Sequence, residues 1–202
     1  MEKAARFFSR MFSPLLVPSY GTFLAMWFSL LVYLPSETRW LAVLATFLIT
    51  GLLPMSVIGT LYYMGRISDP GVNEKKDRLI PYIVAMLCYS GCAVYFFRAN
   101  APLWLSMFFV GAGLATLVSL VVNNWWKISA HGAAMGGIVA ILFRIVSDGH
   151  NVIEMFPVIS SVIIVAGVVG TSRIMLGRHT LWQVIAGTAN GFICVYACSA
   201  LG

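Results

Sequence analysis

Two histidines stand out because each lies beside cations, at the edge of a long apolar run. His131 occurs in KISAHG, residues 127 to 132, and His179 occurs in SRIMLGRHTLWQ, residues 172 to 183. Imidazole titrates near neutral pH, so a pair of histidines can serve as nucleophile and general acid. Polar groups at membrane depth are costly and are retained mainly where they have a function. The two segments therefore predict a catalytic site.

The cations near the histidines indicate an anionic substrate. Arg78 and Arg173 can supply fixed positive charge for phosphate oxygens, and one or both of Lys75 and Lys76 can join them. Ser129 is placed to cap the helix that follows it, whose first N–H groups would also suit a phosphate. The sequence has no cluster of Asp, Glu, His or Cys with metal-ligand spacing. These features predict phosphoryl transfer through histidine, with neither a metal nor another cofactor.

The composition is that of a membrane protein. Sixty per cent of the 202 residues are hydrophobic and ten per cent are charged, against roughly a quarter charged in soluble domains. Seven apolar runs are each long enough to cross the ~30 Å hydrocarbon core. We predict an all-α bundle of six to seven transmembrane helices in a single domain, residues 1–202, with a catalytic core at about 65–201. The runs cover residues 14–34, 40–64, 79–97, 102–123, 129–146, 155–171 and 180–201.

The positive charges predict the orientation of this bundle. If seven helices alternate, the N-terminus and residues 65–78, 124–128 and 171–179 share one face, which carries ten of the thirteen Lys and Arg residues. Positive charges accumulate on the cytoplasmic side of membrane proteins. We therefore expect an integral membrane protein with its polar face in the cytoplasm and its N-terminal run kept as the first span. Three polar clusters, residues 73–81, 127–132 and 172–183, would then meet at the cytoplasmic face.

Other functional classes fit the sequence poorly. The net charge of +6 comes from basic residues scattered among short loops, so no nucleic-acid face is expected, and the bilayer and a lipid headgroup are the better partners. Two cysteine pairs at i, i+4 read as small packing residues: Cys88 with Cys92, and Cys194 with Cys198. A channel or proton pathway is disfavoured because no ionisable residue lies in the middle of a run.

The polar clusters resemble the motifs of the type 2 phosphatidic acid phosphatase superfamily, which also contains the vanadium haloperoxidases. That family carries K-x6-R-P, P-S-G-H and S-R-x5-H-x3-D motifs. SRIMLGRH is similar to the third motif, with its five-residue gap, and ISAH to the second. The matching residues are Ser172, Arg173 and His179, and Ser129 and His131. The resemblance spans roughly residues 65 to 190 and implies the family's helical core. It is to the bacterial type of member, which implies a bacterial inner membrane as the location.

The resemblance also implies a mechanism. His179 would attack the phosphorus to form a phosphohistidine. His131 would protonate the leaving alcohol and then help water to attack. Arg173 would hold the phosphate, and Gln183 stands at the position of the residue that orients the nucleophile. The other implied phosphate ligands are Arg78, Lys75 or Lys76, Ser129, Ser172 and Gly132, a glycine that also permits close helix packing.

The sequence departs from the family pattern in all three motifs. Two residues of the second motif are replaced, and the Arg and Pro of the first are separated; the positions are Ile128, Ala130, Arg78 and Pro81. In the third motif, Gln183 replaces the Asp. Gln183 lies one helical turn past His179 and could accept a hydrogen bond from its Nδ1–H. An amide fixes the tautomer but does not stabilise an imidazolium as a carboxylate does.

Three functions remain open at this stage. The first is a phosphatase that removes a terminal phosphate from a membrane lipid such as phosphatidic acid, phosphatidylglycerol phosphate or a prenyl diphosphate. The second is a phosphotransferase that passes the same phosphate to another alcohol. The third is a non-catalytic lipid-binding or transport protein that has kept the phosphate cradle, and Gln183 is the feature in its favour.

Overall fold

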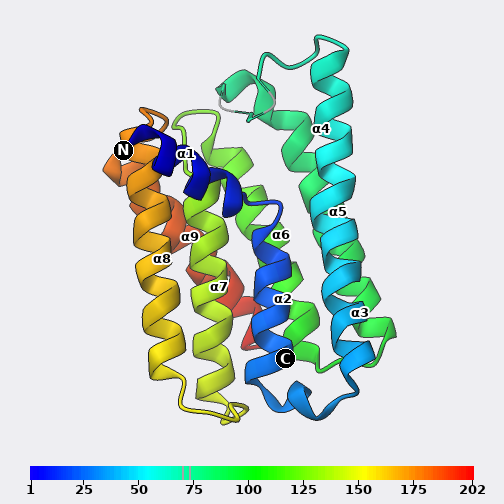
Figure 1. The fold of residues 1–202 in the computed structure, drawn as a ribbon. Helices are drawn as coiled ribbons and strands as arrows, with labels where there is room; N and C mark the ends of the chain where they lie inside the picture. Colours follow the sequence, from blue (N-terminus) through cyan, green and yellow to red (C-terminus); the bar gives the residue numbers. More distant parts are fainter. Residues whose placement is uncertain (70, 73) are drawn as a thin grey trace.

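The chain folds into an upright bundle of helices, with one short helix across its end (Figure 1). The computed structural model describes residues 1–69, 71–72 and 74–202, with the backbone alone of Lys76. Within these residues the predicted all-α class is confirmed, and the extended pairing is a single bridge between Ser29 and Asn151. The elements are α1 (Glu2–Met11), α2 (Val17–Phe28), η1 (Leu30–Tyr33), α3 (Ser36–Thr46), η2 (Phe47–Leu52), α4 (Leu53–Tyr63), η3 (Lys75–Arg78), α5 (Leu79–Arg98), α6 (Leu103–Val122), α7 (Ala130–Ser147), α8 (Phe156–Met175) and α9 (Leu181–Ser199).

Among the described residues, six helices are long and apolar enough to cross a bilayer, which makes this an integral membrane protein. The prediction of a long first helix over residues 14–34 is wrong. That region contains α2, of twelve residues, and the 3-10 turn η1. The chain leaves the α-helical path at Ser29, whose backbone is extended and whose hydroxyl accepts a hydrogen bond from Leu31 N–H.

Although α2 is short, the segment around it runs the full height of the bundle beside α7. Ser9, before α2, contacts His131 at the start of α7, and Leu30, after α2, donates its N–H to the carbonyl of His150 beyond the end of α7. The N-terminal segment therefore starts at the same end of the bundle as the start of α7, as the alternating topology predicted.

The second apolar run forms one continuous helical span, Ser36–Tyr63, of 28 residues. Its middle, η2, is π-helical and lies directly before Pro54 at the start of α4. Proline has no N–H to donate to the preceding turn, and π-bulges are one way in which a helix accommodates that loss. The kink expected at Pro54 therefore takes the form of a local widening.

Helices α7 and α9 form the tightest seam of the bundle. A Cβ atom added at Gly191 of α9 would lie 1.8 Å from the carbonyl oxygen of Ala133, and one added at Gly136 of α7 would lie 2.1 Å from that of Thr188. Glycine lets the two backbones touch, as at small-residue interfaces in membranes. This seam fixes the start of α7, which carries His131, relative to the start of α9, which follows His179.

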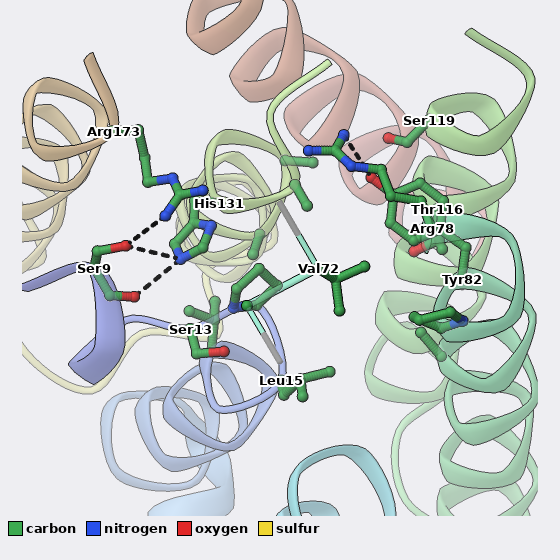
Figure 2. A pocket seen from close by; sticks show the side chains of 18 of the residues that line it. Ser9, Ser13, Leu15, Val72, Arg78, Tyr82, Thr116, Ser119, His131 and Arg173 are labelled. Atoms are coloured by element: carbon green, nitrogen blue, oxygen red, sulfur yellow. Dashed lines mark hydrogen bonds between the residues drawn. The ribbon is translucent and has the colours of Figure 1, made fainter. Parts of the chain in front are cut away.

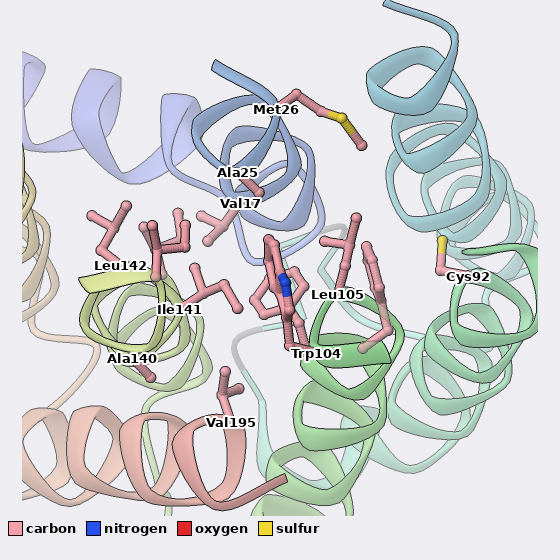
Figure 3. Packing of buried hydrophobic residues seen from close by; sticks show 14 of the residues in the cluster. Val17, Ala25, Met26, Cys92, Trp104, Leu105, Ala140, Ile141, Leu142 and Val195 are labelled. Carbon is pink, nitrogen blue, oxygen red and sulfur yellow. The ribbon is translucent and has the colours of Figure 1, made fainter. Parts of the chain in front are cut away.

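The apolar core fills the half of the bundle away from the polar clusters. Helices α2, α6, α7 and α9 converge there on Trp104 and Leu105 (Figure 3). Ala140, Ile141 and Leu142 of α7 are fully buried in the same cluster. Because α7 is surrounded by its neighbours, its N-terminal end holds Ser129 and His131 in a fixed position.

The predicted convergence of the polar segments is observed at the other end. Lys75 Nζ donates to the carbonyl of Asn124 at 2.6 Å, and Arg78 Nη1 donates to the carbonyl of Ile128 at 3.0 Å. The N-terminal segment joins them through Ser9, whose hydroxyl accepts a hydrogen bond from Arg173 Nη1 at 2.8 Å. Segments far apart in sequence are thus linked at one end of the bundle.

Candidate functional site

A cavity of about 760 Å³ opens at the polar end of the bundle. This volume lies within the usual range of small-molecule sites. Both candidate histidines line it, together with side chains from α1, α5, α6, α8 and the loop before α5. In Figure 2, His131, Arg173 and Ser9 lie on one wall and Arg78 on the opposite wall, with Val72 between them in this view.

The mouth of the cavity is strongly basic. Among the described residues that line it, five are arginines and two are acidic: Arg6, Arg10, Arg78, Arg173 and Arg178, with Glu2 and Asp69. Burial, followed by repulsion from Arg78, also lowers the pKa of the neighbouring Lys127. So much positive charge in a partly desolvated pocket favours an anionic ligand.

His179 lies in the connection between α8 and α9 and is oriented by the start of α9. Thr180 and Gln183 form a capping box, in which the Thr180 hydroxyl accepts from the Gln183 N–H and Gln183 Oε1 accepts from the Thr180 N–H at 3.2 Å. The same Oε1 lies 3.1 Å from Nδ1 of His179. Since a backbone N–H can only donate, the Gln183 atom is an acceptor, and His179 Nδ1 must carry the hydrogen.

This tautomer leaves the lone pair of His179 on Nε2. The ring is buried and lines the cavity. Burial, followed by repulsion from Arg173 and Arg78, lowers the pKa of His179 to about 4, against the opposing effect of the Gln183 hydrogen bond. His179 is therefore neutral at pH 7, with a free nitrogen available as a nucleophile.

His131 lies in the first turn of α7 and is oriented by a distant part of the chain. Its Nε2 lies 2.9 Å from the carbonyl oxygen of Ser9 and 3.5 Å from the Ser9 hydroxyl. A carbonyl oxygen only accepts, so Nε2 carries a hydrogen. The proton-bearing nitrogen that would serve a general acid thus points at the backbone of α1.

The two candidate phosphate-binding arginines are both buried. Arg78 Nη1 contacts the carbonyl of Ile128, the side-chain oxygen of Asn123 at 3.4 Å and the hydroxyl of Tyr82 at 3.4 Å. Its Nε is buried and has no hydrogen-bond partner, an arrangement that is costly unless a ligand completes it. Arg173 donates to Ser9. The arginines are therefore placed by the protein before any ligand arrives.

The structure does not bring all the predicted phosphate ligands to the cavity. Lys75 is exposed and bonded to Asn124, and the side chain of Lys76 lies outside the described residues. The Ser129 hydroxyl caps α7 by accepting from the Gly132 N–H at 3.2 Å, and both residues are buried outside the lining of the cavity. Ser172 donates to the carbonyl of Val168 within its own helix. Four expected ligands thus act in local structure instead, because helix caps and close helix contacts already use their polar groups.

Conversely, sequence reasoning missed Ser9 and Arg178. Ser9 is buried beside both His131 and Arg173. No local pattern predicts a contact between residues 122 positions apart. Arg178 directly precedes His179, and its charge alone could have suggested a place in the site. The contribution of α1 had no signal beyond its amphipathic sequence.

Below its basic mouth the cavity becomes apolar. Along α6 its lining runs from Ser119 through Ala115 and Ala112 to Phe108, which at ~1.5 Å per residue spans about 16 Å. This is about half of the ~30 Å hydrocarbon thickness, the depth of one leaflet. Tyr89 of α5 lines the same region. The shape therefore suits a molecule with an anionic head and an apolar chain.

Within the described part of the chain, no group of three or more His, Cys, Asp or Glu side chains is arranged to hold a metal ion. No family model matches the chain, and no curated protein or solved structure compared with it matches either. Function is therefore inferred from the residues and geometry of the site itself.

Proposed function

We propose that this chain is a membrane lipid phosphatase that hydrolyses a terminal phosphate monoester or diphosphate of a lipid through a phosphohistidine. One observation carries the proposal. Two buried arginines and two histidines, from three segments distant in sequence, line one cavity. The same cavity continues into an apolar channel. The resemblance to the type 2 phosphatidic acid phosphatases, carried by Ser172, Arg173 and His179, agrees with this assignment.

In the first half-reaction, Nε2 of His179 attacks the phosphorus and the bond to the lipid oxygen breaks. His131, in its protonated form, gives its proton to the departing oxygen. Arg78 and Arg173 neutralise the charge on the phosphoryl oxygens. In the second half-reaction His131 removes a proton from water, the water oxygen attacks phosphorus, and the phosphorus–nitrogen bond to His179 breaks to release phosphate.

The substrate class follows from the two parts of the cavity. The basic mouth suits a phosphate or diphosphate headgroup, and the apolar channel beside Phe108 and Tyr89 suits an acyl or prenyl chain. Phosphatidic acid, phosphatidylglycerol phosphate and a prenyl diphosphate all meet this description. We place the site at the cytoplasmic face of a bacterial inner membrane, because the end of the bundle that carries it holds ten of the thirteen Lys and Arg residues.

The test is phosphate release in detergent from these three lipids by wild type, His131→Ala and His179→Ala. His150→Ala is the matched control, because this third histidine lies in the far loop and stacks against Trp104. Release that disappears in the first two variants and persists in the control supports the proposal. Turnover that requires an added alcohol would instead assign a phosphotransferase.

One observation favours a second candidate, a lipid-binding protein that has lost catalysis. The partner of His179 is the uncharged Gln183, which gives no electrostatic support to an imidazolium. If wild type and Gln183→Asp both release no phosphate while the purified protein binds the same lipids, the binding function replaces the phosphatase.

A further inference from the structure

Helix α1 lies across the end of the bundle, over the outer ends of α7 and α8 (Figure 1). Its inner face buries Ala5 and Ser9, which are one helical turn apart. Its outer face exposes Lys3 and Phe7, and Arg6 and Arg10 lie between the two faces, where they border both the cavity mouth and the outer surface. The helix therefore has one side packed on the candidate site and the other directed away from the bundle.

The inner face occupies the groups that a phosphate would need. Ser9 accepts the hydrogen bond of Arg173 through its hydroxyl and that of His131 through its carbonyl. A phosphate bound as proposed above would take the guanidinium of Arg173, and its leaving oxygen would take the proton of His131. This step rests on the proposed function. Ser9 and the substrate thus compete for the hydrogen of His131 Nε2 and for one N–H of Arg173, so the proposed proton transfer requires α1 to move.

The two ends of α1 are held differently. At the C-terminal end, the Tyr20 hydroxyl donates to the carbonyl of Met11 at 2.9 Å, and the ring of Phe12 packs edge-on against Tyr20, with 5.7 Å between ring centroids. At the N-terminal end, Met1 is 97% exposed and the ion pair of Glu2 lies within the helix, with Arg6. The C-terminal end is thus tied to α2, while the rest of the helix is held by its packing on α8 and by Ser9, so a movement of α1 would hinge at Phe12.

The outer face suits an anionic lipid surface. Phe7 is 61% exposed and Met11 is 45% exposed, so the protein itself leaves apolar side chains uncovered at the polar end of the bundle. Lys3, Arg6 and Arg10 stand beside them and line a shallow groove with them. Swinging outward about Phe12 would bring the apolar side chains into the headgroup layer and the cations onto anionic headgroups, the usual mode of binding for a basic amphipathic helix.

We propose that α1 is a lid whose inner face closes the cationic site with Ser9 and whose outer face docks on anionic lipid headgroups, so that an anionic membrane surface opens the site. Opening breaks the hydrogen bond from His131 Nε2 to the Ser9 carbonyl and that from Arg173 Nη1 to the Ser9 hydroxyl, so both donors can turn to a ligand. In a neutral membrane, α1 stays over the site.

The experiment uses a cysteine at a position that the lid buries. Two variants, Ser9→Cys and Ala5→Cys, are prepared separately. Each is reconstituted in nanodiscs of neutral phosphatidylcholine and in nanodiscs of the same lipid with phosphatidylglycerol. The rate of alkylation by a water-soluble maleimide is then measured. Ala5 makes no side-chain hydrogen bond to the site, so it reports on the lid without weakening it. The native cysteines Cys88, Cys92, Cys194 and Cys198 are buried and provide the background. Ala99→Cys, in the exposed far loop, is the control for direct effects of lipid charge.

We expect alkylation of both lid cysteines to be at least fivefold faster in the anionic discs, with no comparable change at Ala99→Cys. Adding Lys3→Glu and Phe7→Ser on the outer face should abolish the acceleration. Equal rates in the two lipids, or fast alkylation in both, overturns the proposal. A rate that follows the number of protein copies per disc assigns the outer face to a second copy and also overturns it. Because no turnover is measured, this result stands apart from that of the phosphatase assay.

Discussion

His179 and His131 line the same cavity, yet their ring nitrogens are oriented by opposite means. His179 is held by Gln183, four residues away, within the capping box that starts α9. His131 is held by Ser9, 122 positions away, on a helix that lies over the site. A local partner is formed whenever its helix forms, whereas a remote partner depends on how α1 is docked. In the proposed mechanism, the nucleophile His179 is therefore fixed and the proton donor His131 can be switched by α1.

The largest effect should come from removing His179, the histidine whose orientation is fixed locally. His179→Ala deletes the attacking nitrogen, so phosphate release should fall by on the order of 10⁴-fold or more, as for other covalent nucleophiles. The loss should be the same for every substrate, because no substrate can bypass the phosphohistidine. Release by the variant within tenfold of wild type would contradict a covalent role. A matching thermal unfolding midpoint would show that the fold is retained.

His131→Ala should have a smaller effect that depends on the substrate. General acids contribute about 10² to 10⁴ in rate, and less where the leaving group needs no proton. The variant should therefore lose much more activity on an alkyl phosphate, such as phosphatidic acid, than on an aryl phosphate such as 4-nitrophenyl phosphate. Equal losses on both would place His131 in binding instead of proton transfer.

Gln183→Asp tests how the hydrogen-bond partner of His179 sets the pKa of that histidine. A carboxylate beside Nδ1 favours the imidazolium and so raises the pKa of His179 from about 4. Attack needs the neutral ring, so the acid limb of kcat/KM should move to higher pH. At neutral pH the rate should rise about tenfold or more, below the ~10⁴ cost of the reverse amide change in a serine protease triad. Asn124→Asp adds the same charge at an exposed position of the same end and should leave the profile unmoved.

Ser9→Ala should have the smallest effect. It removes the hydroxyl that accepts from Arg173 but keeps the carbonyl that accepts from His131. One hydrogen bond contributes ~1 kcal/mol, so the closed state should weaken by a factor of about five and release in neutral vesicles should rise accordingly. In anionic vesicles, with the lid already displaced, the variant should match wild type. Slower release in both vesicles would mean that Ser9 supports catalysis.

The sequence predicted those parts of the site whose geometry is local. The spacing of His179 and Gln183 indicated one helical turn, and their side chains are hydrogen-bonded. The N-cap at Ser129 is likewise present. The predicted length of the first helix was wrong. The chain leaves the helical path at Ser29, which pairs with Asn151 in the loop after α7, and a contact between such distant residues has no local signal. Sequence context did not show that Lys75 would bond the carbonyl of Asn124 or that Gly132 would pack against α9, because both contacts join distant segments.

Hydrophobicity and charge, read along the chain, determine that the protein is a helical membrane bundle with its polar clusters at one end. Those properties follow from the lengths of the apolar runs and from the alternation of the helices across the membrane, and both can be read directly from the sequence. Only the tertiary structure places α1 over the site and brings Ser9 between His131 and Arg173. Contacts between distant residues depend on how whole helices pack, and that packing is a property of the folded chain rather than of any local stretch of it.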